Sequence, residues 1–180
     1  MRKFYKLKLW TLLMAVGTMA IFPVFEAVAQ QEVDYTLHAK FLYHFTKYIE
    51  WPEDRRAGNF VVGIAGNEDL YTFMNTIAQK KKIKGQNLIV LKIKNTDDPS
   101  SCHMLFVARG RNSALPGFVL KIGNRAVLVI TEKAGSLRQG SDINFVINNN
   151  NLNFELNSTG ATGKRMAVSS ELRNLATRNE

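Results

Sequence analysis

The sequence predicts an α/β protein, a three-layer sandwich with a largely parallel central sheet and a C-terminal antiparallel hairpin. Apolar segments of strand length alternate along most of the chain with segments whose apolar residues recur at helical spacing. Such alternation is typical of a parallel sheet covered by helices. Towards the C-terminus, two segments of alternating polarity flank four consecutive asparagines, which favours a hairpin with one wetter face.

The first predicted helix covers residues 33–49. Its apolar residues recur every four positions and are Leu37, Phe41, Phe45 and Ile49. This spacing places them on one helix face. We expect the helix to end before Trp51-Pro52, because a proline disfavours helical backbone in the residue before it.

Four predicted strands follow, each a short apolar run: residues 59–65, 87–93, 104–108 and 126–131. Helices are expected over residues 70–81 and 113–122, the second weakened by Pro116 and Gly117. The segments 95–101 and 132–141 are rich in turn formers and are predicted loops.

The last third of the chain is predicted to form a hairpin and two helices. Residues 143–147 and 152–156 alternate in polarity, and the asparagines between them tolerate left-handed turn geometry. Helices are expected over residues 158–166 and 169–176, and the last one contributes Val168, Leu172 and Leu175 to the core.

The first 29 residues have the layout of a secretory signal peptide. A basic head precedes an apolar run over residues 9–25, and the small-residue triplet Ala27-Val28-Ala29 follows. We expect cleavage after Ala29 and export of a single domain, residues 30–180. The alternative is a retained membrane anchor, because the apolar run is close to the lower limit for spanning a bilayer.

The formal net charge of +9 overstates the basicity of the exported part. Four of the 24 Lys and Arg and one of the 15 acids precede Gln30, so residues 30–180 carry 20 bases and 14 acids, a net of +6. An anionic partner and simple solubility both account for this charge, and we favour solubility.

The residues that carry chemistry do not form a credible catalytic set, so we expect a protein that is not an enzyme. Cys102 is the only cysteine, which excludes an internal disulfide. We expect it to be a small buried hydrophobe, because neighbouring His103 would point to the opposite strand face. His38 and His44 are six residues apart, whereas metal ligands on one helix face are three or four apart. We expect both at the surface or its boundary, and no metal or cofactor.

Three charged residues are candidates for binding. Arg109 and Arg111 follow the third strand, at the sheet edge where α/β folds usually bind ligands. They are predicted to contact an anion or an acidic partner, or else to be ordinary loop charges. Glu155 has two alternatives. On the covered face of the sheet, Arg165 or Arg173 would pair with it, and on the solvent face it would need no partner.

Six segments in order resemble the YfiR family of bacterial periplasmic proteins. They are the strand ending at Gly66 and the segments FLYHFTKYIEWP (41–52), CHMLFV (102–107), GSDINFV (140–146), LNFELN (152–157) and VSSELRNLA (168–176). The likeness runs from Val33 to Ala176. Trp51, Pro52, Cys102 and Phe154 are its structural positions, and Glu155 and Asn157 are its candidate partner- or ligand-binding positions, with Arg109 and Arg111.

The resemblance implies a periplasmic regulator without catalytic turnover. Family members hold an inner-membrane diguanylate cyclase inactive by binding its periplasmic sensor domain, which lowers cyclic di-GMP and disfavours biofilm. A histidine kinase receptor, a homodimer and a stand-alone small-molecule binder are the alternatives, and no nucleic acid is expected. Redox-responsive members carry paired cysteines, but the expected partner of Cys102 near Gly63 and the second pair are missing here. The resemblance therefore implies a signal other than redox state.

Overall fold

The computed structural model describes residues 34–180. The predicted signal peptide and its cleavage site after Ala29 lie outside these residues. Five parallel strands form the centre of the structure, in the spatial order β4 (Gln86–Lys92), β2 (Phe60–Ala65), β5 (Met104–Val107), β6 (Leu128–Thr131) and β7 (Ile143–Asn148). Strand β4 lies on one side of β2, the first of these strands in the sequence, and β5, β6 and β7 lie on the other side of β2. This order defines a doubly wound sheet whose switch point is between β2 and β5.

Short or antiparallel strands complete the sheet at both edges. The predicted hairpin is present, because β8 (Asn151–Leu156) pairs antiparallel with β7. Its turn residues Asn149 and Asn150 have φ of 49° and 59°, the left-handed geometry that asparagine tolerates. At one edge of the sheet β10 (Arg178–Asn179) pairs parallel with β8, and at the other edge β3 (Lys82–Ile83) pairs antiparallel with β4. These two-residue strands have no periodicity that a sequence pattern could reveal.

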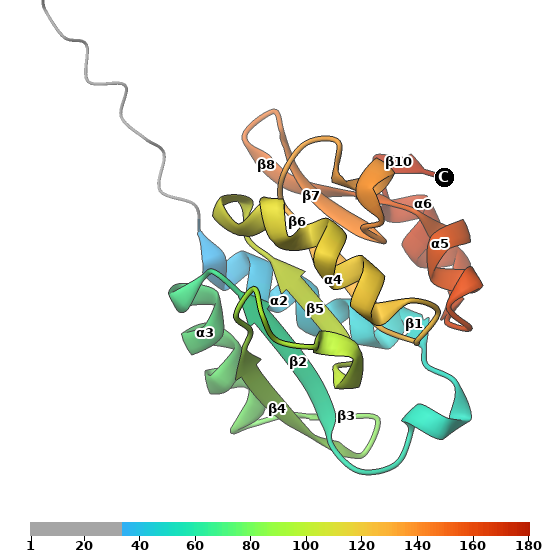
Figure 1. The fold of residues 1–180 in the computed structure, drawn as a ribbon. Coiled ribbons are helices and arrows are strands. Elements are labelled where there is room, and N and C mark those ends of the chain that lie inside the picture. The colour runs from blue at the N-terminus through green and yellow to red at the C-terminus, as the bar shows by residue number, and fades with distance from the viewer. Residues whose placement is uncertain (1–33) are drawn as a thin grey trace, which may run out of the picture. The chain divides into compact units, whose positions relative to one another are not determined.

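Helices cover both faces of the sheet, so the predicted three-layer architecture is confirmed (Figure 1). The helices α2 (Tyr35–Tyr48) and α3 (Glu68–Ala78) lie on one face, and α4 (Leu115–Ile122) lies on the other. Strand β5 shows the division. Met104 and Phe106 pack in the core beneath α2 and α3, whereas Leu105 and Val107 pack beneath α4, because successive strand residues point to opposite faces.

Side chains cap the two helices on the first face. Asp34 accepts the backbone N–H of Thr36 at 2.9 Å, and Asn67 accepts that of Leu70 at 2.7 Å, satisfying donors that a helix end leaves free. At its other end α2 changes at Ile49 into the strand β1 (Ile49–Glu50), which pairs antiparallel with β9 (Ala167–Val168).

The predicted loops 95–101 and 132–141 contain the 3₁₀ turns η2 (Pro99–Ser101) and η4 (Ser136–Gln139). Two further 3₁₀ turns are η1 (Glu53–Arg55) and η3 (Arg109–Ala114), and η3 occupies the start of the helix predicted over residues 113–122. The C-terminal helices are α5 (Ser158–Gly163) and α6 (Ser170–Leu175). The prediction of one helix over residues 158–166 was wrong at its end. Arg165 has φ of 65°, which breaks the helix and directs the chain into β9. Residues 34–180 form one compact unit, and none of the helices within them is long and apolar enough to cross a membrane.

Candidate functional site

An open apolar groove lies between α2, β8 and α6, with a volume of about 340 Å³. The wall formed by α2 consists of Leu37, Lys40, Phe41, His44, Phe45 and Tyr48. Phe154 of β8 contributes to the lining, and Leu172 and Leu175 of α6 form the opposite wall. The groove therefore lies among the C-terminal hairpin and helices and one face of the first helix.

Aromatic packing fixes the lining of the groove. The ring centroids of Phe45 and Phe154 are 5.1 Å apart in an edge-to-face arrangement, and those of Phe41 and Phe154 are 6.2 Å apart. Phe45 is 1% exposed and Phe154 is 4% exposed. Because both rings are held in the core, this part of the surface is pre-formed and does not have to assemble on binding.

The rim of the groove exposes apolar side chains to solvent. Leu175 is 60% exposed and Leu37 is 37% exposed. Clustered apolar side chains at the surface mark interaction sites more often than isolated ones do. The sequence pattern identified Leu37 and Leu175 as core residues, because periodicity finds an apolar face without showing what covers it.

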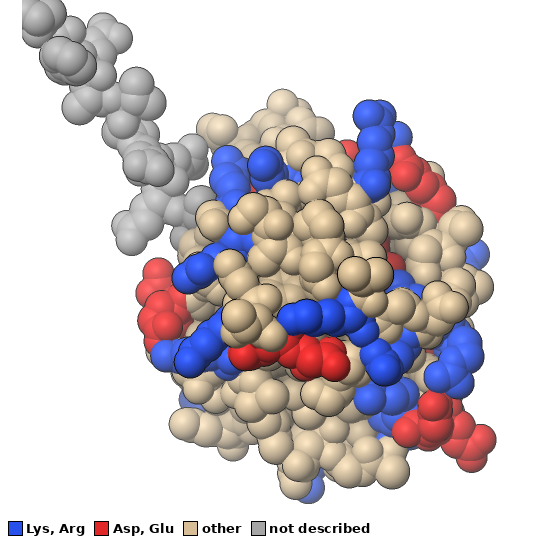
Figure 2. All heavy atoms as spheres, viewed as in Figure 1, with Lys and Arg blue, Asp and Glu red and all other residues tan. Residues whose placement is uncertain are grey.

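The groove is basic on the side of α2. Lys40 is the only Lys, Arg, Asp or Glu side chain in its lining, and no Asp or Glu occurs within Tyr35–Tyr48. On the face that carries α4, by contrast, basic and acidic side chains are interspersed (Figure 2).

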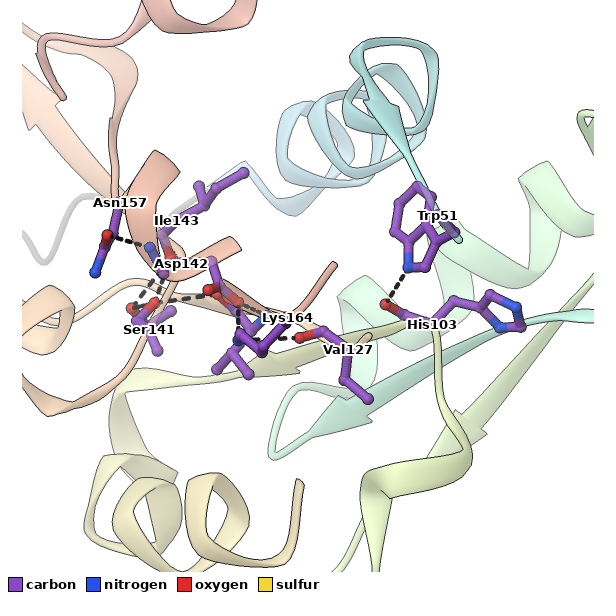
Figure 3. A network of polar contacts seen from close by, with 11 residues as sticks. Trp51, His103, Val127, Ser141, Asp142, Ile143, Asn157 and Lys164 are labelled. Carbon is purple, nitrogen blue, oxygen red and sulfur yellow. Dashed lines mark hydrogen bonds and ion pairs between the residues drawn. The ribbon is translucent and has the colours of Figure 1, made fainter. Parts of the chain in front are cut away.

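A second cavity of about 260 Å³ lies between α4 and α5 and has polar groups in its lining. Lys164 Nζ lies 2.5 Å from Asp142 Oδ2 and 3.2 Å from the carbonyl oxygen of Val127 (Figure 3). Burial raises the pKa of the Asp142 carboxyl, and the neighbouring Lys164 ammonium opposes that rise. Asn157 also lines this cavity, and its Oδ1 accepts the N–H of Gly160 at 2.7 Å to cap α5.

Glu155 is half-buried on the sheet face opposite Phe154 and Leu156. Its Oε2 accepts Asn144 Nδ2 at 3.0 Å, and Asn144 Oδ1 in turn accepts the Thr131 hydroxyl at 2.8 Å. Asn144 is directly opposite Glu155 in the β7–β8 register, so the carboxylate finds a cross-strand partner.

Of the two alternatives for Glu155, the one that pairs it with Arg165 or Arg173 on a covered face was wrong. Arg165 bonds to Asp54 at 3.2 Å, and Arg173 donates to the carbonyl oxygen of Val168 at 2.6 Å. Arg165 thus pairs with a residue of η1 and Arg173 with the last residue of β9, and the side-chain partner of Glu155 is Asn144.

Arg109 and Arg111 lie at the carboxyl edge of the sheet, and both are exposed. The backbone N–H of Arg109 donates to Glu132 Oε1 at 2.9 Å, and its guanidinium donates to the Glu132 carbonyl oxygen at 3.3 Å. The aliphatic part of Arg111 covers Gly66, because a Cβ built on that glycine would lie 2.2 Å from Arg111 Cγ. The role of these arginines in binding stays a prediction.

A buried polar cluster joins the start of α2 to the end of β6. The Tyr35 hydroxyl lies 3.1 Å and 3.2 Å from the two Glu132 carboxylate oxygens, and His38 Nε2 lies 3.7 Å from Oε2. His38 is 2% exposed, so its expected place at the surface or its boundary was wrong, although His44 is exposed as expected. Burial lowers the pKa of His38. The helical spacing could not show that the face carrying His38 is covered by Phe145.

Cys102 is buried among the residues under α4, as expected, and burial raises its thiol pKa to about 11. His103 is also buried, with Nδ1 3.1 Å from the backbone N–H of Val61, which donates to it. Trp51 donates its indole N–H to the His103 carbonyl oxygen at 3.2 Å, and Pro52 precedes η1. Within residues 34–180, His, Cys, Asp and Glu side chains form no group of three that could hold a metal ion.

These features define a doubly wound α/β domain with an open apolar groove beside its first helix. The chain belongs to the YfiR/HmsC-like family, whose model matches residues 35–177. It is similar in structure to a conserved domain protein from Vibrio cholerae O1 biovar El Tor, with a TM-score of 0.58 and 10% sequence identity. That match covers 82% of this chain and 60% of the other, less than two thirds of it, and shows the fold alone. No curated protein matches the chain.

Proposed function

We propose that this chain is a periplasmic regulatory protein that binds and represses the periplasmic sensor domain of an inner-membrane signalling protein. A diguanylate cyclase controlling cyclic di-GMP and biofilm is the receptor we favour. Membership of the YfiR/HmsC-like family supports a regulator of this type, and the signal peptide predicted before Gln30 supports export.

The open apolar groove between α2 and α6 is the observation that carries the proposal. It exposes Leu37 and Leu175 over a fixed aromatic lining, which is a feature of a surface that recognises a protein partner. A regulator that acts by binding needs such a surface and needs no catalytic side chains.

Deletion of the gene tests the proposal in the source bacterium. We expect cyclic di-GMP and biofilm to rise, and re-expression of the chain to restore repression. Leu175→Asp, which places a charge at the groove rim, should fail to restore repression. Leu120→Asp is the matched control, because Leu120 is 84% exposed but lies on α4.

Capture of the receptor completes this test. A membrane protein with a periplasmic domain and a cytoplasmic output domain should be recovered with the wild-type chain and with Leu120→Asp, and should be lost with Leu175→Asp. Unchanged cyclic di-GMP together with no captured receptor would contradict the proposal. A captured histidine kinase would retain the regulatory function and change the class of receptor.

A stand-alone small-molecule binder is the second candidate function, and the cavity beside Asp142 and Lys164 favours it. A screen of polar metabolites by thermal shift would support it if one compound stabilised the purified chain without any partner. Loss of that stabilisation in Asn157→Ala would place the compound in this cavity.

A further inference from the structure

The groove has the shape of a helix-binding surface. Along α2, Leu37, Phe41, His44 and Tyr48 form its wall, at the spacing i, i+4, i+7 and i+11 of one helix face. At 1.5 Å per residue this wall extends about 16 Å, which matches about three turns of a second helix. Leu172 and Leu175 lie three residues apart on α6 and form the facing wall.

Charge distinguishes what this groove accepts. Lys40 lines the groove. Lys47 lies seven residues further along α2, outside the lining, with its Nζ 5.5 Å from the centre of the Tyr43 ring. Both lysines are exposed. No acid lies within Tyr35–Tyr48, although the N-cap Asp34 precedes it, and Lys40 is the only Lys, Arg, Asp or Glu side chain in the groove lining. An occupant with carboxylates along one edge would therefore gain favourable contacts, whereas a basic occupant would face like charge.

We propose that the groove docks an amphipathic helix of the partner protein, with apolar residues at i, i+3 or i+4, and i+7 and with Asp or Glu along the edge facing Lys40 and Lys47. Helix-in-groove recognition uses such anchors. Because the aromatic lining is pre-formed, the conformational entropy lost on binding is mainly that of the partner helix. The inference rests on the proposed function, since it specifies how the sensor domain would be held.

Two synthetic peptides test the inference without the receptor. Both are fluorescently labelled amphipathic helices of about 14 residues with the same leucine face. One carries Glu along the edge of that face, and the other carries Lys there. By fluorescence anisotropy we expect the full chain, expressed with its leader and purified, to bind the Glu peptide about tenfold more tightly or better.

Variants locate the binding and its charge dependence. Lys40→Glu combined with Lys47→Glu should reverse the preference between the two peptides. Leu175→Asp should abolish binding of the Glu peptide, whereas Leu120→Asp on α4 should leave it unchanged. Equal affinity for the two peptides, or binding that Leu175→Asp does not affect, would overturn the inference.

Two further measurements test whether a second copy of this chain or a lipid surface occupies the groove instead. Dimerisation in sedimentation velocity that Leu175→Asp abolishes would assign the groove to a second copy of this chain and overturn the inference. Co-sedimentation with phosphatidylglycerol vesicles that depends on Leu175 would assign the groove to a lipid surface, with the same consequence.

The proposed regulatory function and the inferred docking of a helix in the groove can be contradicted separately. Peptide binding that meets these expectations, in a strain whose cyclic di-GMP does not respond to deletion, contradicts the proposed receptor and leaves the groove inference in place. Regulation that responds to deletion but survives Leu175→Asp places the receptor contact elsewhere.

Discussion

Lys164 Nζ lies 2.5 Å from Asp142 Oδ2, and this ion pair joins the end of α5 to the start of β7. The Asp142 side chain is 2% exposed and that of Lys164 is 13% exposed. The same carboxylate oxygen accepts the Val129 N–H at 2.7 Å. The pair therefore connects β7 to α5, which precedes α6, the helix whose Leu172 and Leu175 form one wall of the groove.

Lys164→Met should destabilise the protein by about 3–5 kcal/mol at pH 7, because it leaves a buried carboxylate without its cation. Urea denaturation followed by Trp51 fluorescence measures this loss. The double variant Asp142→Asn with Lys164→Met should be more stable than Lys164→Met alone, because the remaining group is neutral. A single-variant loss within about 0.5 kcal/mol of zero would contradict a structural role for the pair.

The cost of Lys164→Met should shrink in acid. Burial raises the pKa of Asp142 above its ordinary value of 3.8, so the folded state binds more protons than the unfolded state between the two pKa values. Stability contributed by this group is then present below the unfolded pKa and is lost as the pH rises through the folded pKa. Because the Lys164 ammonium opposes this rise in the pKa, its removal raises the Asp142 pKa further, and the variant loses more stability than the wild type as the pH rises. Urea denaturation of the variant and the wild type at pH 4 and pH 7 checks this, and an equal loss at both would contradict it.

The Cys102 thiol should resist labelling in the folded protein. Its pKa is raised from 9.0 to about 11 by burial, which lowers the thiolate fraction near pH 8 by about a hundredfold, before access is considered. Ellman's reagent should react slowly with the native protein and rapidly in urea. Rapid native labelling, or a disulfide-linked dimer after mild oxidation, would restore redox control as an explanation.

Gly66→Ala should cost more stability than Gly58→Ala. Both glycines have positive φ, +88° and +73°, so both substitutions carry the backbone strain of about 1–2 kcal/mol. Only at Gly66 would the new Cβ meet another side chain, Arg111, at 2.2 Å. Arg111→Ala should relieve that excess in a double variant. Thermal unfolding of the four proteins measures each contribution, and equal costs at the two glycines would contradict the contact.

Tyr35→Phe should destabilise the protein by about 1 kcal/mol at pH 7 through loss of the hydrogen bond to Glu132. Burial, with Glu132 next, raises the pKa of Tyr35 to about 12, so the folded phenol stays protonated where the unfolded one ionises. Wild-type stability from this group is therefore lost as the pH rises from 10 towards 12. The difference between the variant and the wild type should narrow over that range in urea denaturation, and a constant difference would contradict the assignment.

The sequence predicts the architecture because the parallel core is encoded locally. Phe60–Ala65 and Met104–Val107 are short apolar runs that must be buried on both faces, and the asparagine turn between β7 and β8 matches its left-handed backbone. The two-residue strands β1 and β9 could not be predicted, since Ile49 finds Val168 only when the whole chain has folded.

The candidate site was predictable only in part. The stripe through Leu37 and Phe41 was visible, but the pattern could not show that α6 stops short of covering it, because exposure depends on distant elements. Arg109 and Arg111 were expected at the carboxyl edge of the sheet, where they lie, but the contacts of Arg109 with Glu132 and of Arg111 with Gly66 were not predicted. Glu155 has its partner in the residue opposite it across the hairpin, a relation set by register.

The sequence by itself determined the order of the main helices and of the strands longer than two residues, the burial of Cys102 and the resemblance to one family, since these depend on periodicity and on residue types at fixed spacing. The tertiary structure decided the rest. It buried His38, paired Asp142 with Lys164, and left a basic-edged apolar groove open between the first helix and the last. Each of these features depends on contacts between residues that are far apart in the sequence, and such contacts form only when the chain folds.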